Sequence, residues 1–230
     1  MKVSHCLLLM ALVCCLAGCG EDDPVASVES LDGLSLLGLV NNRALTYLQT
    51  DTVVTIDSTY DVRVTTSSEV VRLSTSAGNW TVADGSLPVL SLKVSGDKVI
   101  LNGYWRKVDG MDSLFHFPTP PILMSRSVET MVPWEGFTPF FDSDSTSIAR
   151  FFYYAYFGFY FTKEYRGAEE LVLPAGSFTA HRFDVDLFVN QSDTIPAVRV
   201  SEYYATSVGL VKLHLQGGPL TRILSLVDFN

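Results

Sequence analysis

The amino-acid sequence predicts an all-β, mainly antiparallel protein: a curved sheet or half-barrel with a Pro-rich loop insert and little helix. Short β-branched and aromatic segments recur from about Val40 to the C-terminus, and sustained helical periodicity is hard to find. Turn residues separate these segments at Asp57-Ser58, Gly78-Asn79, Asp84-Gly85, Gly96-Asp97, Asp109-Gly110, Asn190 to Asp193 and Gly217-Gly218. Short strands punctuated by turn signals are typical of antiparallel sheets.

The composition excludes several classes of protein. A length of 230 residues suits one domain, or at most two small ones. The 16 Lys and Arg residues against 25 Asp and Glu give a net charge of −9, without a basic block, so we expect no nucleic-acid partner. Aromatic residues make up 12% of the chain, which argues against disorder.

The N-terminus predicts a secretory signal. Met1-Lys2 supplies a positive start, and Cys6 to Leu16 is an uninterrupted apolar run. Eleven residues are too few to cross a hydrocarbon core of about 30 Å comfortably as a helix, which favours a signal peptide over a membrane span. All four cysteines lie in the first 19 residues, so we expect no disulfide and no thiolate metal site in the body.

The end of this run resembles the lipobox of bacterial lipoprotein precursors, in the sequence Leu16-Ala17-Gly18-Cys19. The resemblance implies cleavage between Gly18 and Cys19, with Cys19 carrying acyl chains such as palmitate that anchor the protein to a membrane. The alternative is an ordinary secretory signal in which Cys19 is incidental. Because Gly20 and not Asp follows the cysteine, the sorting rule of this class favours the outer membrane over the inner membrane.

The remaining chain divides into a tether and one domain. Residues 19–34 are expected to be an acidic, flexible tether, and residues 35–230 a single β-rich domain. A helix is allowed only within Val25 to Leu39, where leucines and a valine could form an apolar stripe. The clearest strands are Tyr60 to Thr66, Val70 to Ser74, Val89 to Val94, Lys98 to Lys107, Phe151 to Thr162, Phe178 to Val189, Ala197 to Tyr204, Gly209 to Leu215 and Leu220 to Phe229.

A Pro-rich insert at about residues 114–148 is expected to interrupt the sheet. It holds five of the ten prolines, and proline cannot donate a hydrogen bond to a β-ladder. This stretch is therefore expected to be rich in loops, between an N-terminal and a C-terminal meander.

Three separated motifs resemble those of uncharacterised envelope β-rich lipoproteins. Leu39 to Tyr47 is similar to an "LxVGNxWxY" opening, with Asn41 and Leu45 in place of the Gly and the Trp. Leu173 to Phe178 resembles "VPAGTF", and Tyr203 to Lys212 resembles "YYAPGVGLVK". The resemblance implies a curved antiparallel sheet, likened to the LolA/LolB-like half-barrel of periplasmic lipoprotein carriers and receptors. It implies no established activity.

The most unusual segment is Phe151 to Phe161, where nine of eleven residues are aromatic. In a strand, one face would be apolar, whereas the other would carry tyrosines whose polar tips suit a half-wet surface. We expect Tyr154, Tyr156 and Tyr160, with Trp134 from the insert, to bind a ligand or a protein partner. The alternative is a central strand that is buried on both sides.

Candidate catalytic and metal-binding patterns are weak. Ser177, His181 and Asp184 could suggest a triad, but strand alternation places His181 on the apolar face, opposite Asp184. Asp142 to Thr146 begins like a calcium loop, yet Ser147 stands where an EF-hand needs Gly. We therefore expect no catalytic residues, no metal and no cofactor.

The sequence therefore favours a non-enzymatic binding or interaction module of the bacterial envelope, anchored through lipidated Cys19. Its partner would be a small hydrophobic ligand or an envelope protein. The alternative is a periplasmic carrier or receptor for lipid, or for another hydrophobic ligand, in a half-barrel cavity. An envelope hydrolase is the least favoured.

Overall fold

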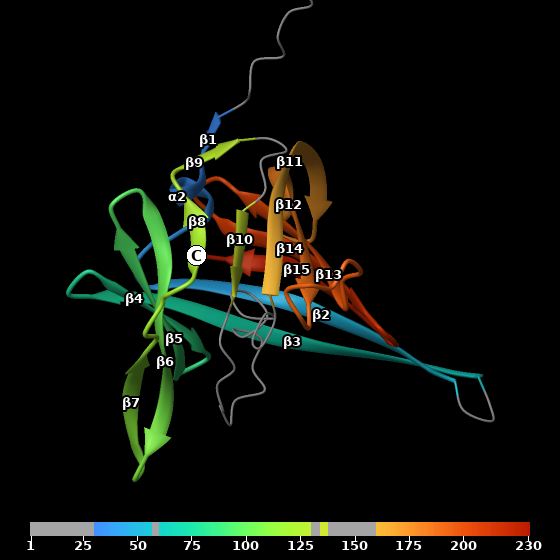
Figure 1. Ribbon diagram of the computed structural model, residues 1–230, viewed down its shortest axis with the longest axis horizontal. Coiled ribbons are helices and arrows are strands. Elements are labelled where there is room, and N and C mark those ends of the chain that lie inside the picture. Colours follow the sequence, from blue (N-terminus) through green and yellow to red (C-terminus); the bar gives the residue numbers. More distant parts are fainter. Residues whose placement is uncertain (1–29, 57–59, 130–133, 138–159) are drawn as a thin grey trace, which may run out of the picture.

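Two antiparallel meanders form one strongly curved sheet in the computed structural model, which describes residues 30–56, 60–129, 134–137 and 160–230 (Figure 1). The N-terminal meander consists of β2 (Arg43–Ile56), β3 (Tyr60–Ser76), β4 (Asn79–Asp84), β5 (Leu87–Ser95), β6 (Lys98–Val108) and β7 (Met111–His116), and β8 (Ile122–Ser125) also pairs with β6. The C-terminal meander consists of β10 (Trp134–Phe137), β11 (Tyr160–Leu173), β12 (Gly176–Phe188), β13 (Val198–Ala205), β14 (Gly209–Gly217) and β15 (Leu220–Phe229). The predicted all-β fold is confirmed.

Strands β15 and β2 join the two meanders side by side. Their antiparallel register runs from Leu220 opposite Val53 to Phe229 opposite Leu45. The sheet order is therefore β10-β11-β12-β13-β14-β15-β2-β3-β4-β5-β6-β7, and within the described residues the sheet stays open, with β10 and β7 as its edges. An insert between two meanders is what the sequence predicts.

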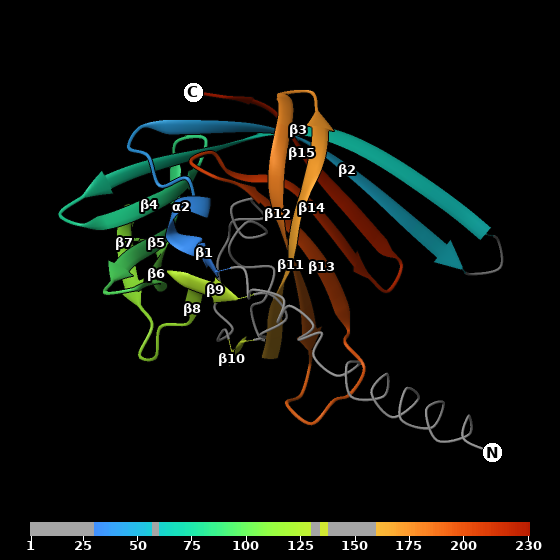
Figure 2. The ribbon, with the colours of Figure 1, turned by 90° about the horizontal axis from the view of Figure 1, so that it is seen from above.

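The concave face of the sheet, called the inner face here, carries the core. Its buried side chains alternate along the strands, as Phe183, Val185 and Leu187 do on β12. The short helix α2 (Gly33–Leu36) and the pair of β1 (Ser30–Asp32) with β9 (Ser127–Glu129) lie within the curve of the sheet (Figure 2). Leu36, Leu37 and Val128 belong to the same buried cluster, so these elements cover the inner face.

The N-terminal segment is fixed by close backbone contact with the β13–β14 hairpin. Ser207 N donates to Ser35 O at 2.9 Å, and Gly38 has a φ of +57°. A Cβ on Gly38 would lie 2.2 Å from the carbonyl oxygen of Val208, so a larger residue would clash there. Gly209 also lies close to the N-terminal segment, because a Cβ at this position would be 3.2 Å from Leu37 O.

Several boundaries differ from the sequence-based expectation. Residues 30–34 are part of the folded domain and not of the expected tether, because β1 pairs with β9 and Gly33 of α2 is buried. The insert at 114–148 contains β8, β9 and β10 as well as the end of β7. Its strands avoid proline, and Pro118, Pro120 and Pro121 lie in the connection between β7 and β8.

Strand β11 also extends well beyond the expected end at Thr162, because it runs from Tyr160 to Leu173. The strands Arg43–Ile56 and Asn79–Asp84 are absent from the predicted set. Residues 151–159 lie outside the described residues, as does Asp57-Ser58. Among the described residues, no helix has both the length and the apolar character needed to cross a bilayer.

Candidate functional site

Strand pairing brings Trp134 and Tyr160, two of the predicted binding residues, onto neighbouring strands. The backbone of Trp134 is opposite Lys163, and Phe137 is opposite Tyr160, so the two strands run side by side at one edge of the sheet. Tyr160 is half-buried. Gly18, Cys19, Tyr154 and Tyr156 lie outside the described residues, and nothing tests the roles expected for them.

A cleft of about 410 Å³ opens at this edge, and Tyr160 is one of its lining residues. This volume falls within the range of small-molecule sites, which is about 300 to 1,000 Å³. The lining residues come from β10, β11, β12 and the loop after β12: Glu135, Tyr160, Phe161, Thr162, Phe188, Gln191 and Asp193.

The register of the strands explains why most of these side chains converge. Glu135 is opposite Thr162, and Tyr160 is opposite Phe188. Cross-strand partners share a face, and Thr162 is two residues from Tyr160, so all four lie on the outer, convex face of the sheet.

The loop after β12 closes one side of the cleft through local hydrogen bonds. Asn190 N donates to Asp193 Oδ2 at 2.9 Å, and Asp193 N donates to Asn190 O at 3.1 Å. These bonds form a compact turn of the type that Asn and Asp favour. Ala197 N then donates to Leu187 O at 2.7 Å, which returns the chain to the sheet before β13 begins.

The chemistry of the cleft is mixed. Tyr160 and Phe188 present aromatic rings, whereas Glu135 and Asp193 present carboxylates and Gln191 an amide. Aromatic rings bind apolar or ring-shaped groups, and carboxylates accept hydrogen bonds from hydroxyl or ammonium donors. The lining therefore suits an amphipathic small molecule with an apolar part and hydrogen-bond donors.

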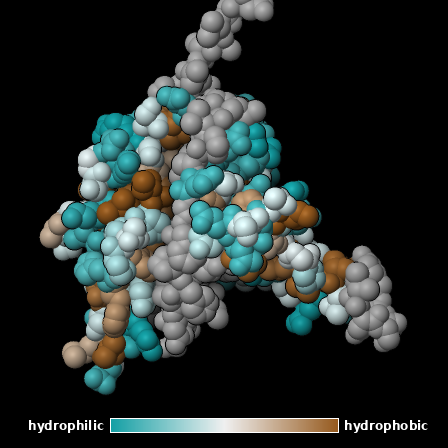
Figure 3. All heavy atoms as spheres, viewed as in Figure 1, coloured by the Kyte–Doolittle hydropathy of each residue, from teal (hydrophilic) through white to brown (hydrophobic). Residues whose placement is uncertain are grey.

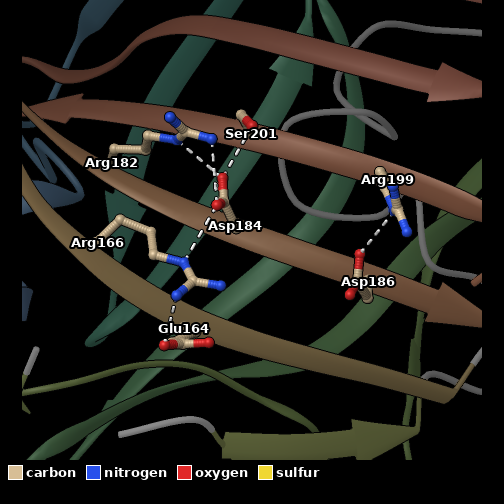
Figure 4. Close-up of polar contacts among 7 residues, drawn as sticks. All are labelled: Glu164, Arg166, Arg182, Asp184, Asp186, Arg199 and Ser201. Atoms are coloured by element: carbon tan, nitrogen blue, oxygen red, sulfur yellow. Dashed lines mark hydrogen bonds and ion pairs between the residues drawn. The ribbon is translucent and has the colours of Figure 1, made fainter. Parts of the chain in front are cut away.

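A charged network lies on the same outer face, centred on Asp184 of β12 (Figure 4). Arg182 donates to both carboxylate oxygens, from Nε at 2.9 Å and from Nη2 at 3.1 Å. Ser201 Oγ donates at 2.9 Å and Arg166 Nε at 3.2 Å. The hydrogen bonds that Arg182 itself donates to Asp184 hold the pKa of the Arg182 guanidinium above its usual value.

Because four donors converge on Asp184, its carboxylate links β11, β12 and β13 through side-chain hydrogen bonds. Arg166 extends the network to Glu164, with Nη1 2.8 Å from Oε1. A second pair, Asp186 and Arg199, lies beside the cleft, because Asp186 is opposite Thr162. Its 3.7 Å separation and exposed Arg199 side chain make it a weak pair.

The inner face holds a second polar cluster, which the sequence analysis missed. Lys163 Nζ lies 2.6 Å from Glu202 Oε2, and these side chains are 6% and 2% exposed. Tyr204 Oη donates to the same carboxylate at 3.2 Å. The Lys163 ammonium also lies 5.1 Å from the ring centroid of Phe183 and 5.4 Å from that of Tyr204. Such cation–π contacts add to the ion pair in a buried site.

His181 lies on the inner face too, where its Nδ1 is 2.8 Å from the hydroxyl oxygen of Tyr165. Asp184 lies on the opposite face, as strand alternation predicts. His181 and Asp184 therefore cannot act together as a local base and its orienting acid. Among the described residues, no group of three or more His, Cys, Asp or Glu side chains could hold a metal ion.

A signal for the inner cluster is present in the sequence. In β13, Val200, Glu202 and Tyr204 share the buried face. A glutamate in the middle of an inward-facing series needs a buried cation, because an unpaired buried charge is very costly. The partner could not be assigned, because the expected strand ended one residue before Lys163.

Comparisons with known proteins find remote structural similarity. No protein-family model and no curated protein matches the chain. A protein of Bacteroides fragilis with a YmcC-like fold, inferred to be exported, is 14% identical, with a TM-score of 0.34 over 85% of this chain and 98% of that one. A protein of Parabacteroides distasonis, inferred to be a lipoprotein, is 9% identical, with a TM-score of 0.38 over 88% of this chain and 100% of that one.

The third similar structure is a β-barrel-like protein of the domain of unknown function DUF1849 from Brucella abortus. It is 10% identical, with a TM-score of 0.42 over 84% of this chain and 98% of that one.

Proposed function

We propose that the protein is a lipid-anchored lipoprotein of the bacterial envelope that binds a small amphipathic ligand, without catalysis, in the cleft at Tyr160. The observation that carries the proposal is the cleft itself. It has the volume of a small-molecule site, and its lining combines aromatic rings with carboxylates. Membrane attachment through Cys19, and the absence of a nucleic-acid partner, are parts of the same proposal.

Location in the bacterial envelope is supported by the signal-peptide pattern and the lipobox-like motif in the sequence. Acyl chains on Cys19 would hold the domain at the membrane surface, since each buried CH₂ contributes about 0.8 kcal/mol. The chain from Cys19 to Ser30, where β1 begins, can span at most about 40 Å. Gly20 after the lipidated cysteine favours the outer membrane.

A test of this address compares the natural chain with a Cys19→Ser variant by membrane fractionation. The natural chain is expected in the outer-membrane fraction, and the variant in the soluble periplasmic fraction. Retention of the variant in the membrane fraction would overturn the proposal that lipidated Cys19 anchors the protein. Gly20→Asp is expected to move the lipidated protein to the inner membrane, and Gly20→Ala serves as its control.

Binding without catalysis is supported by the contacts of Asp184 and His181, two of the residues that a catalytic triad would need. Asp184 accepts hydrogen bonds from Arg166, Arg182 and Ser201, and His181 is in contact with Tyr165 on the other face. A general base needs a lone pair that can reach a substrate proton. The donors around Asp184 occupy its lone pairs.

Ligand binding can be tested with two probes, N-phenyl-1-naphthylamine and a bacterial phospholipid extract. The aromatic amine is expected to bind the natural chain with increased fluorescence. Tyr160→Ala is expected to weaken that binding about tenfold, which corresponds to about 1.4 kcal/mol of lost contact. Phe115→Ala is the control, because Phe115 is 38% exposed on β7, far from the cleft in the sheet order.

Glu135→Gln is a second variant that keeps the fold, because Glu135 is exposed. It is expected to weaken amine binding with little change in stability. Equal affinity in all variants would overturn the assignment of the cleft. If phospholipid co-purifies in native mass spectrometry and Tyr160→Ala removes it, the alternative function of a lipid carrier or receptor is supported.

A further inference from the structure

The side chains that line the cleft at Tyr160 carry negative charge. Glu135 comes from β10 and Asp193 from the loop after β12, and no lysine or arginine is among the described lining residues. In the sheet order, β11 lies between β10 and β12. The two carboxylates therefore come from elements on either side of the strand that carries Tyr160.

These two carboxylates are not neutralised by a cation of the protein. Within the part of the chain that the structure describes, neither Glu135 nor Asp193 forms an ion pair. The hydrogen bonds that Asp193 accepts come from the backbone N–H and the side-chain amide of Asn190, which are neutral. Glu135 is exposed. Both negative charges are thus available to a ligand.

The basic side chains of the neighbouring strands are paired with other carboxylates. Arg199 of β13 lies 3.7 Å from Asp186 of β12. Arg166 and Arg182 both contact Asp184 (Figure 4). The lysine of β11 lies on the inner face, in its buried ion pair. These cations therefore do not offset the charge of the cleft lining.

Two aromatic side chains complete the lining. Tyr160 and Phe188 occupy paired positions of β11 and β12, so they are neighbours on one face of the sheet. The face of an aromatic ring attracts cations, and ammonium ligands are recognised in this way. The rings also bind apolar groups. A neutral ligand would gain only the ring contacts, and an anionic ligand would be repelled by the carboxylates.

We propose that the cleft selects organic cations in which an ammonium group is joined to an apolar chain or ring. This inference rests on the proposed function, because it names the class of ligand for the same cleft. The ammonium group contacts the carboxylates, and the apolar part contacts the rings. The visible surface over β11 is mainly hydrophilic (Figure 3). Surroundings of this kind leave a bound cation partly hydrated, which keeps the cost of its desolvation low.

Three probes that share a phenylbutyl group test the selection by charge. At about pH 7, 4-phenylbutylamine is a cation, 4-phenylbutanol is neutral and 4-phenylbutyrate is an anion. Isothermal titration calorimetry uses the full-length chain in nonionic detergent. The amine is expected to bind about tenfold more tightly than the alcohol, and the carboxylate most weakly. High salt should reduce the preference for the amine, because ions screen exposed charges.

Removal of single charges tests the two carboxylates. Glu135→Gln should lower the affinity for the amine about fivefold and leave that for the alcohol unchanged. Asp193→Asn should act in the same direction, since its amide oxygen can still accept the hydrogen bond from Asn190 N. The double variant should bind the amine no better than the alcohol. Glu169→Gln is the matched control, because Glu169 is exposed on β11 about 30 Å along the strand from Tyr160.

The outcomes separate this inference from the proposed function. Equal affinity for the amine and the alcohol, with both weakened by Tyr160→Ala, would overturn the selection of cations and leave the cleft as a binding site. Failure of all three probes to bind would overturn both. An effect of Glu169→Gln as large as that of Glu135→Gln would assign the preference to the overall charge of the protein, and would also overturn the inference.

Two sources supply such an ammonium group, a soluble amine and the ethanolamine headgroup of a phospholipid. Competition for bound 4-phenylbutylamine distinguishes them. Displacement by a short-chain phosphatidylethanolamine, but not by a phosphatidylglycerol of the same chain length, would identify the headgroup. Displacement by neither lipid would identify a soluble amine. Equal displacement by both lipids would show that the acyl chains and not the ammonium group determine binding, against the inference.

Discussion

Tyr47 donates its buried hydroxyl to the carbonyl oxygen of Leu210 at 2.6 Å, across 163 positions of sequence. Arg43, four residues before Tyr47, donates to the carbonyls of Ser207 and Val208 in the same hairpin. The motif Leu39 to Tyr47 and the motif Tyr203 to Lys212 are therefore in direct contact. The two motifs are far apart in the sequence, but together they form one contact between β2 and the β13–β14 hairpin.

The Tyr47 hydroxyl is expected to contribute to stability because it satisfies a buried carbonyl. Tyr47→Phe keeps the ring and leaves Leu210 O without this donor, which should lower the free energy of unfolding by about 1 to 3 kcal/mol. Urea unfolding measures the change. Thr119→Val, at an exposed loop position, is expected to change stability by less than about 0.5 kcal/mol. Equal effects in the two variants would refute the role of the hydroxyl.

Gly38 is expected to be intolerant of any side chain. Gly38→Ala combines a positive φ with a Cβ that would lie 2.2 Å from Val208 O. Gly96→Ala is the matched control, because Gly96 has a φ of +63° and its Cβ would meet nothing within 4 Å. The free energy of unfolding of Gly96→Ala should fall by about 1 to 2 kcal/mol, because only its positive φ is unfavourable for alanine.

Gly38→Ala should lower the free energy of unfolding by about 1 to 3 kcal/mol more than the control does. This difference is the cost of the steric clash with the β13–β14 hairpin. Both values come from urea unfolding under the same conditions. A loss in Gly38→Ala no larger than that in Gly96→Ala would mean that the hairpin moves aside freely.

The buried ion pair of Lys163 and Glu202 should be sensitive to the loss of one partner. Glu202→Gln leaves the ammonium without its carboxylate, and we expect a loss of about 3 to 5 kcal/mol. Replacing both residues, as Lys163→Met with Glu202→Leu, should recover most of that loss. Chemical denaturation provides the measurement.

The exposed pair Asp186 and Arg199 is the control for this experiment, and Asp186→Asn should cost less than about 1 kcal/mol. If Glu202→Gln is as mild as Asp186→Asn, the cluster around Lys163 does not stabilise the inner face.

Tyr203 should make stability fall at alkaline pH. Burial raises the pKa of this tyrosine above its ordinary value of 10.0, although the positive charge of Arg182 opposes that rise. Above about pH 10 the unfolded chain releases the phenolic proton while the folded chain retains it, so unfolding becomes favoured as the pH rises. Below about pH 10, Tyr203 is protonated in both the folded and the unfolded chain, and its full contribution to stability is present.

The variant Tyr203→Phe should therefore lose less stability than the natural chain between about pH 9 and pH 11. Urea unfolding at several pH values measures the difference, and the other tyrosines contribute equally to both proteins. Parallel stability curves for the two proteins would contradict the prediction.

Much of the fold could be predicted because its turns are explicit in the sequence. The turns at Gly78, Gly85, Gly96, Gly110 and Gly218 all have glycine with positive φ, and they separate consecutive strands as expected. Strand β2 could not be identified with the same ease. Its inner face passes from Leu45 and Tyr47 to Gln49 and Asp51, so the apolar alternation fades along the strand.

The candidate site could be predicted only in part. Aromatic composition pointed to Tyr160, which lines the cleft, and to Trp134, which is not among the lining residues. The cleft also depends on the turn at Asn190 to Asp193. Its position beside β11 follows from strand register, which local sequence does not encode. Most of β11 was missed for the same reason. The stretch from Lys163 to Glu170 is rich in charged residues, and which of its side chains face inward becomes clear only from its pairing with β12.

The pairing of β15 with β2 has a consequence for biogenesis. Arg222 and Asp51, 171 positions apart, form a two-bond ion pair with both distances at 2.6 Å. The pairing between the two meanders can form only after β15 has been synthesised. Folding of such non-local topologies is slow, and the β2 edge is exposed to aggregation until β15 arrives.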